Sequence, residues 1–178
     1  MTMKSIYLAG PDVFFRDAAA HFDALEARCA AHGLRGVRPS DGGLSQGLRG
    51  TGDEIAERIY RANIELLRSC NALLANLMPF RNALEPDSGT VFELGLAVAW
   101  GKPVAGLVPQ RALSYEHKVA AHGGLTRDSQ GLAWDANFGF MIEEFGQPMN
   151  LMLARSTPLF ERTDEALVHL AGLLNRSR

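Results

Sequence analysis

The chain has 178 residues, 47% of them hydrophobic, and a formal net charge of −2. This composition predicts one well-packed domain over residues 1–178, and the weak net charge argues against the basic surface that nucleic-acid binding needs. The sequence has neither a run of about 20 apolar residues nor a signal-peptide pattern, so we expect a soluble, cytoplasmic protein that does not cross a membrane.

Cysteine and histidine are used sparingly. Cys29 and Cys70 lie among mostly apolar residues, which is typical of reduced thiols in a core. The five histidines are scattered and the cysteines form no C-x-x-C pair, so we expect no metal site. The G-x-G-x-x-G fingerprint and the G-x-x-x-x-G-K-[ST] phosphate loop are both missing, so we also expect no cofactor.

Short apolar runs alternate along the chain with amphipathic stretches. In chain order, the apolar runs predict strands at 5–9, 37–39, 72–78, 103–108 and 150–154. The amphipathic stretches predict helices at 16–32, 53–66, 90–100 and 163–174. This alternation predicts an α/β three-layer sandwich, in which a mainly parallel five-stranded sheet is covered by helices on both faces.

Three segments need separate comment. Residues 40–52 are rich in glycine and polar residues, which predicts a mobile loop. The helix that follows has Asp53 as its expected cap, and its stripe of apolar residues is expected to be buried. That stripe consists of Ile55, Ile59, Ala62 and Leu66. Residues 109–138 are polar, contain glycines and predict no definite element.

Residues 85–95 carry the pattern that points most directly to chemistry. Asp87 and Glu93 flank a Ser88-Gly89 turn between a predicted strand and a predicted helix, and we expect Glu93 in the first helical turn. In an open α/β sheet that turn lies at the carboxyl edge of the strands, where ligands bind. Thr90 and Glu93 also match a capping box and Asp87 matches a helix cap, so these residues alone leave both roles open.

Four other residues have a structural and a functional interpretation. Tyr7 lies in the first strand, where an aromatic residue is ordinarily part of the core. Gly10 ends that strand and allows close approach of the backbone to a ligand. Asn63 lies on the apolar side of its helix and is either a buried amide bonded to backbone or a ligand contact. Asn150 follows residues typical of a turn, so its ordinary role is strand entry.

Six segments, in order, resemble the nucleoside 2-deoxyribosyltransferase family. They are residues 6–11, 59–64, 79–81, 85–95, 101–104 and 145–153. The resemblance covers most of the chain and implies a flavodoxin-like fold and transfer of a 2-deoxyribosyl group between nucleobases. It also implies small-molecule partners, namely deoxynucleosides and free nucleobases, and a role in nucleotide salvage.

The resemblance also assigns roles to individual residues. Glu93 matches the nucleophile of the family, Tyr7 the tyrosine beside it, and Asp87 the carboxylate that helps to hold the sugar. Asn150 and Met152 match a segment that reaches into the pocket of the neighbouring subunit. The resemblance therefore implies a homo-oligomer, a dimer or larger, with shared active sites.

The implied reaction is a double displacement. Glu93 attacks the anomeric carbon, expels the base and holds the sugar as an ester until a second base attacks, with net retention. We expect the helix N-terminus to keep Glu93 ionised, and the 40–52 loop to act as a lid against water. Asn63 matches a position near the base where some relatives carry aspartate. An amide cannot supply a proton, so the route of base protonation stays open.

Two other functions remain open. One is an N-glycoside hydrolase that acts on deoxynucleosides or their 5'-monophosphates, with Arg16, Arg61 and Arg81 as candidate phosphate ligands. The other is a nucleotide-binding sensor without turnover. The balance between transfer and hydrolysis depends on access of water, and base preference depends on pocket shape, and the sequence determines neither. The match of the site residues ranks the transferase first among the three functions.

Overall fold

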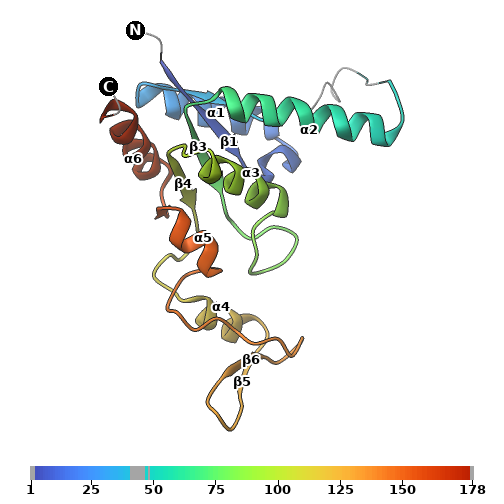
Figure 1. The fold of residues 1–178 in the computed structure, drawn as a ribbon, viewed down its shortest axis with the longest axis vertical. Helices are drawn as coiled ribbons and strands as arrows, with labels where there is room; N and C mark the ends of the chain where they lie inside the picture. Colours follow the sequence, from blue (N-terminus) through green and yellow to red (C-terminus); the bar gives the residue numbers. More distant parts are fainter. Residues whose placement is uncertain (1–2, 41–46, 48, 177–178) are drawn as a thin grey trace.

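The computed structural model describes residues 3–40, 47 and 49–176. A five-stranded sheet lies at its centre, with strand order β2-β1-β3-β4-β7 and parallel pairing throughout (Figure 1). The strands are β1 (Lys4–Ala9), β2 (Leu34–Val37), β3 (Ala72–Asn76), β4 (Val104–Leu107) and β7 (Leu159–Phe160). This arrangement confirms the predicted α/β fold with a five-stranded parallel sheet.

Helices cover both faces of the sheet. One face packs against α1 (Ala18–Ala31) and α6 (Thr163–Arg176), and the other against α2 (Gly52–Ser69) and α3 (Ser88–Ala99). Because side chains alternate along a strand, Ile6 and Leu8 face the first helix pair and Tyr7 faces the second. Both cysteines are buried and free, as expected of core thiols.

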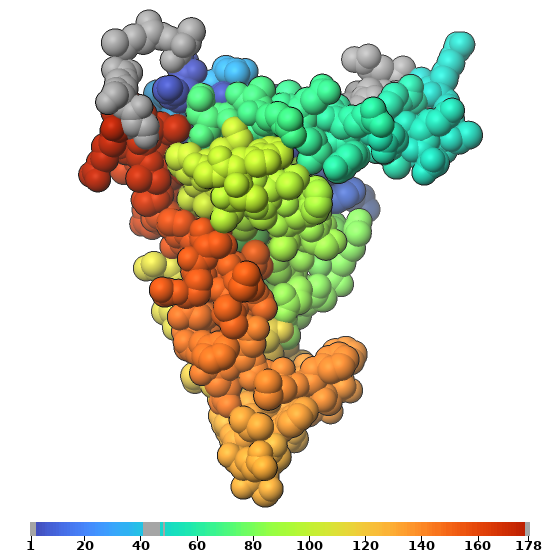
Figure 2. Space-filling view, viewed as in Figure 1, coloured from blue at the N-terminus to red at the C-terminus, as the bar shows by residue number. Residues whose placement is uncertain are grey.

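The chain between β4 and β7 forms an arm that extends from the body (Figures 1 and 2). It contains α4 (Tyr115–His122), an antiparallel hairpin of β5 (Leu125–Arg127) and β6 (Ala133–Asp135), and α5 (Leu151–Ser156). The hairpin and α4 occupy the region for which the sequence predicted no definite element. A small separate core of Val119, Ala133 and Ile142 holds them together.

Three predictions about elements were wrong. The predicted strand at 150–154 is helix α5, because the Asn150 side chain accepts a hydrogen bond from Met152 N and caps it. The second strand ends at Val37 rather than beginning there. The helix predicted to start at Asp53 is capped by Thr51, which forms a capping box with Glu54.

The expected burial of the α2 stripe was also wrong. Ile55, Ile59, Ala62 and Leu66 are only partly buried, and Leu67 is the buried residue of this helix. For Ile55 and Ile59 the reason is visible in Figure 1, since the first half of α2 projects beyond the sheet, whereas Leu66 packs against the core. Most of the predicted loop before it, residues 41–46 and 48, lies outside the described residues.

The described residues provide neither a metal cluster nor a membrane span. No group of three or more His, Cys, Asp or Glu side chains is placed to hold a metal ion in the described part of the chain. Within the same residues, every helix is too short or too polar to cross a bilayer.

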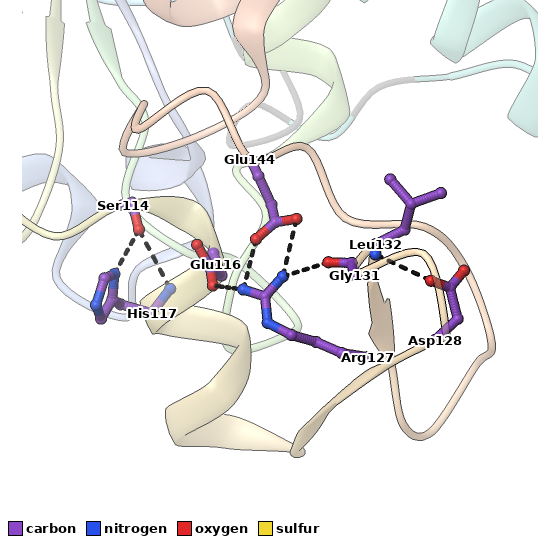
Figure 3. Close-up of polar contacts among 8 residues, drawn as sticks. All are labelled: Ser114, Glu116, His117, Arg127, Asp128, Gly131, Leu132 and Glu144. Carbon is purple, nitrogen blue, oxygen red and sulfur yellow. Dashed lines mark hydrogen bonds and ion pairs between the residues drawn. The ribbon is translucent and has the colours of Figure 1, made fainter.

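Arg127 connects the parts of the arm (Figure 3). Its Nη2 donates to Glu116 Oε1 at 2.5 Å and to Glu144 Oε1 at 2.6 Å, and its Nη1 donates to the carbonyl of Gly131 at 2.7 Å. These contacts link α4, the hairpin and the chain that returns toward α5. The hydrogen bond to Arg127 is also the main reason that the pKa of the Glu144 carboxyl lies below its ordinary value.

We predict that Arg127→Ala loosens the arm and leaves the body intact. Limited proteolysis of the variant is expected to cut faster within residues 123–147, while the thermal unfolding of the body stays close to that of the wild type. Arg162→Ala is the control, because Arg162 is an exposed arginine with one weak contact to Glu165. Equal cleavage rates in Arg127→Ala and Arg162→Ala would contradict the assignment.

Candidate active site

The candidate site lies at the carboxyl ends of β1 and β3, where the strand order reverses. This is the position at which open α/β sheets bind ligands. Tyr7 comes from β1, and Asp87 and Glu93 come from the beginning of α3. The Tyr7 hydroxyl donates a hydrogen bond of 2.6 Å to Glu93 Oε1. Two residues that are 86 positions apart in the sequence are therefore in direct contact.

Asp87 caps α3, so Glu93 is not needed as a capping residue. Asp87 Oδ2 accepts hydrogen bonds from Thr90 N at 2.9 Å and from Thr90 Oγ1 at 3.0 Å. The helix begins at Ser88, so Thr90 is inside it and the capping box expected between Thr90 and Glu93 does not form. Glu93 consequently lies in the second helical turn, with its carboxylate directed to Tyr7 instead of the helix start.

The Glu93 carboxyl has an unusual pKa. Burial raises it, the hydrogen bond from Tyr7 lowers it, the negative charge of Asp87 raises it again, and the resulting pKa is about 7. The raised pKa means that Glu93 is only partly ionised at neutral pH, and burial is the main cause. Burial and the neighbouring Glu93 also raise the pKa of Tyr7 far above its ordinary value, so Tyr7 acts as a hydrogen-bond donor.

Asn63 lies on α2 and is half-buried. Its Oδ1 accepts a hydrogen bond of 2.7 Å from the backbone N–H of Ser40. The amide therefore holds the chain that leaves β2 against α2, which is one of the two roles the sequence left open. Within the described residues its Nδ2 group donates no hydrogen bond, and contact with a base remains a prediction.

Asn150 and Met152 lie beside the start of α3. With Glu85, Pro86 and Val91, among others, they line a cavity of about 370 Å³. Asn150 also donates from Nδ2 to Glu143 Oε1 at 3.0 Å, and the side chain of Met152 is 70% exposed. The structure thus places these two residues at the edge of the site without a contact to Tyr7 or Glu93 in the described chain.

The arginines proposed for a phosphate differ in their surroundings. Arg61 is exposed and paired with Glu57 at 2.5 Å. Arg81 lies in the loop between β3 and α3, with its guanidinium stacked over the Phe80 ring. Arg81 is therefore the candidate that is connected to the site by its own loop.

Sequence reasoning missed two polar contacts near the site. Tyr115 on α4 donates to Glu85 Oε1 at 2.5 Å and so ties the arm to the segment before α3. Asp12 is buried and bonded to Asn76 at the end of β3. The only sequence signal was their position: Asp12 follows the Gly10-Pro11 turn, and Glu85 begins the segment that carries Asp87 and Glu93.

A model of the nucleoside 2-deoxyribosyltransferase family matches residues 6–152, a range that contains every one of the predicted site residues. The chain belongs to this family. An uncharacterized protein of Schizosaccharomyces pombe is 33% identical over 156 residues, which cover 83% of this chain and 74% of that protein.

Two solved structures resemble this deoxyribosyltransferase-family chain. A 2-desoxiribosyltransferase from Leishmania mexicana matches with a TM-score of 0.68 and 30% identity, over 95% of this chain and 97% of that one. A conserved protein from Enterococcus faecalis shares the fold, with a TM-score of 0.58 and 16% identity over 97% and 99% of the two chains. The family match and the first structure support a deoxyribosyltransferase-type enzyme with nucleoside and nucleobase substrates.

We predict that two substitutions move the Glu93 pKa in opposite directions. Tyr7→Phe removes a hydrogen bond to the ionised carboxylate, so the pKa rises above that of the wild type. Asp87→Asn removes a nearby negative charge while keeping an oxygen for the cap, so the pKa falls. Carbon-13 NMR titration of the side-chain carboxyls measures both. A shift in the same direction for both variants would contradict the electrostatic account.

We also predict that Glu93→Gln stabilises the protein at pH 8 far more than at pH 5. The folded pKa of about 7 exceeds the ordinary value of 4.5, so the folded state binds the proton more tightly and the wild type loses stability as pH rises between these values. A shift of this size corresponds to about 3 kcal/mol in the free energy of unfolding. Urea denaturation at both pH values tests this, with exposed Glu165→Gln as the control.

Proposed function

We propose that this protein transfers a 2-deoxyribosyl group between nucleobases by double displacement through an ester of Glu93. The observation that carries the proposal is the hydrogen bond of 2.6 Å from Tyr7 to a half-buried Glu93 that has no capping role. Structural carboxylates at helix starts satisfy backbone N–H groups, and this one does not. Membership of the family supports the assignment of Glu93 as the nucleophile.

The two oxygens of Glu93 have different tasks in this mechanism. Oε1 accepts the hydrogen bond from Tyr7, which fixes the orientation of the carboxylate. Oε2 attacks the anomeric carbon of the deoxynucleoside, and the electron pair of the glycosidic bond leaves with the base. The nitrogen of a second base then attacks the same carbon, and the ester bond breaks. Two inversions give net retention.

The charge state of Glu93 sets the pH range of the first step. Only the ionised carboxylate is a nucleophile, and a pKa of about 7 leaves a substantial ionised fraction at neutral pH. The departing base needs a proton or a strong hydrogen bond. Asn63 can donate a hydrogen bond to the base through Nδ2, but an amide cannot supply a proton. In this proposal the proton therefore comes from solvent.

Asp87 holds the sugar with the oxygen that the helix does not use. Oδ2 carries both capping hydrogen bonds, and within the described residues Oδ1 has no hydrogen-bond partner. We assign Oδ1 to a deoxyribose hydroxyl. One carboxylate therefore starts the helix that carries the nucleophile and aligns the sugar against it. Gly10 stays a predicted contact of the substrate with the backbone.

We further propose a homo-oligomer, at least a dimer, in which Asn150 and Met152 complete the site of a neighbouring subunit. The exposed side chain of Met152 and the partly covered stripe of α2 support this arrangement. So do three aromatic residues of the arm with highly exposed rings, Phe138, Phe140 and Phe145.

Residues from both ends of the chain share one core, since Ile6 packs in the same cluster as Leu170, which supports a single domain.

Product analysis tests the proposed function. The protein is incubated with deoxyinosine, with and without adenine, and then with thymidine as the donor. Formation of deoxyadenosine is expected, and the donor comparison defines the base preference. Free deoxyribose regardless of acceptor would instead identify a hydrolase, and no product from any donor would identify a sensor.

Removal of the nucleophile gives the matching prediction. Glu93→Ala is expected to lower the rate of base exchange by roughly 10³-fold or more without changing the fold, because the covalent route is lost. Glu165→Ala, on the exposed side of α6, serves as the control. Mass spectrometry of the wild type with deoxyinosine alone is expected to show one added deoxyribosyl group. A Glu93→Ala variant with near wild-type exchange would overturn the mechanism.

A further inference from the structure

Asp12 is a buried carboxylate that the proposed chemistry does not use. It is 4% exposed, and both of its oxygens accept hydrogen bonds from Asn76 Nδ2, at 3.1 Å and 2.9 Å. Its Oδ1 also lies 2.6 Å from His21 Nε2. A buried carboxylate costs stability unless its partners compensate for lost water. Three such contacts at one side chain therefore require an explanation.

These contacts join three elements at the carboxyl edge of the sheet. Asp12 lies in the short helix η1 (Pro11–Phe14) directly after β1, Asn76 is the last residue of β3, and His21 lies at the start of α1. Asn76 Oδ1 in turn accepts from Met78 N at 3.1 Å and so fixes the first residues after β3. The loop after β1 and the loop after β3 are thus bonded to each other at the point where the strand order reverses.

The contact between Asp12 and Asn76 also limits which residue fits at position 10, which is Gly10. A Cβ atom at this position would lie 2.0 Å from Asp12 Oδ2 and 2.9 Å from Asn76 Cβ. Relieving this overlap would move the Asp12 carboxylate and so disturb its hydrogen bonds to Asn76. The glycine is therefore required by the folded-back carboxylate of Asp12, in addition to any approach of a substrate.

A second, outer contact connects the same two loops. The Phe14 ring stacks on the Phe80 ring with centroids 5.4 Å apart, and the Arg81 guanidinium lies over both rings. Arg81 has a φ of 61°, a left-handed conformation that side chains rarely adopt. Residues held in such conformations cluster at ligand clamps. Phe14 remains 59% exposed.

We propose that Asp12 is a positioning residue, which holds the loop after β1 against the loop after β3 so that together they grip the deoxynucleoside. The inference rests on the proposed function for the identity of the ligand. Asp12 makes no contact with Tyr7, Asp87 or Glu93 within the described chain, so its loss acts on substrate affinity and leaves the nucleophile in place. The link acts from the α1 side of the sheet, while the nucleophile acts from the α3 side.

The test is the affinity for deoxyinosine, measured by titration calorimetry in a Glu93→Ala background that does not consume the ligand. Adding Asp12→Asn is expected to weaken binding by about tenfold, as loss of hydrogen bonds to a charged group predicts. In enzymes with Glu93 intact, KM is expected to rise by a similar factor while kcat and the apparent pKa near 7 stay unchanged. Unchanged affinity and KM in a folded Asp12→Asn variant would overturn the proposal.

Two further variants separate positioning from general stability. The reciprocal exchange Asp12→Asn with Asn76→Asp restores an amide–carboxylate pair across the loops and is expected to recover most of the lost affinity. Asp164→Asn removes a comparable contact, His32 Nε2 to Asp164 Oδ1 at 3.4 Å, away from the site, and is expected to leave affinity unchanged. If the exchange fails to recover affinity, or if Asp164→Asn weakens it equally, the proposal is wrong.

Asn76→Ala carries the test if Asp12→Asn does not fold. Asn76 is only partly buried, and this substitution removes both hydrogen bonds that join the two loops while leaving the contact of Asp12 with His21. A weaker affinity for deoxyinosine is expected, and an unchanged affinity would overturn the proposal. Because binding is measured without turnover, a loss of affinity is informative even if product analysis were to favour hydrolysis over transfer.

Discussion

The hydrogen bonds from Thr90 to Asp87 are the constraint on which the site depends. A helix that begins beside a buried strand needs an acceptor for its first N–H groups, and without one its start is costly. Asp87 supplies an acceptor for Thr90 N, so Glu93 has no part in the cap and meets Tyr7 on β1. Helix α3 begins at Ser88, two residues before the start that the sequence predicted. The place of the Glu93 carboxylate within the helix follows from this earlier start.

The released carboxylate is destabilising where it lies. Glu93 is half-buried next to the core residue Leu94, and within the described residues the hydrogen bond from Tyr7 is the one that its side chain accepts. Its raised pKa records this imbalance, and the apolar core between the sheet and the helices α2 and α3 supplies the stability that tolerates it. A poorly solvated carboxylate is also the more reactive nucleophile. The same burial therefore weakens the fold and equips the site.

The sequence predicted the parts of the structure that local patterns determine. The strand after Cys70 and the helix that carries Glu93 follow from apolar runs and spacing, and both are present. The contact between Tyr7 and Glu93 joins distant segments, so only the family resemblance indicated it. A short apolar run such as residues 150–154 fits a strand and a buried helix equally well, and we predicted a strand. The side-chain cap at Asn150 favours the helix that is present. The Glu93 pKa depends on burial, which no spacing encodes.

The two anchors, Asn76 and Asp87, define how this site can change. Asn76 is fixed by Asp12 and Asp87 by Thr90, so both ends of the loop between β3 and α3 are held by hydrogen bonds to neighbouring elements. The residues between them include the stacked Phe80 and the left-handed Arg81, while Leu77 and Pro86 are buried. Substitutions of the Phe80 and Arg81 side chains change this aromatic surface and leave both anchors in place, because within the described residues neither side chain bonds to Asn76 or Asp87. In the proposed transferase, this arrangement separates the loop surface open to a base from the carboxylate that reacts with the sugar.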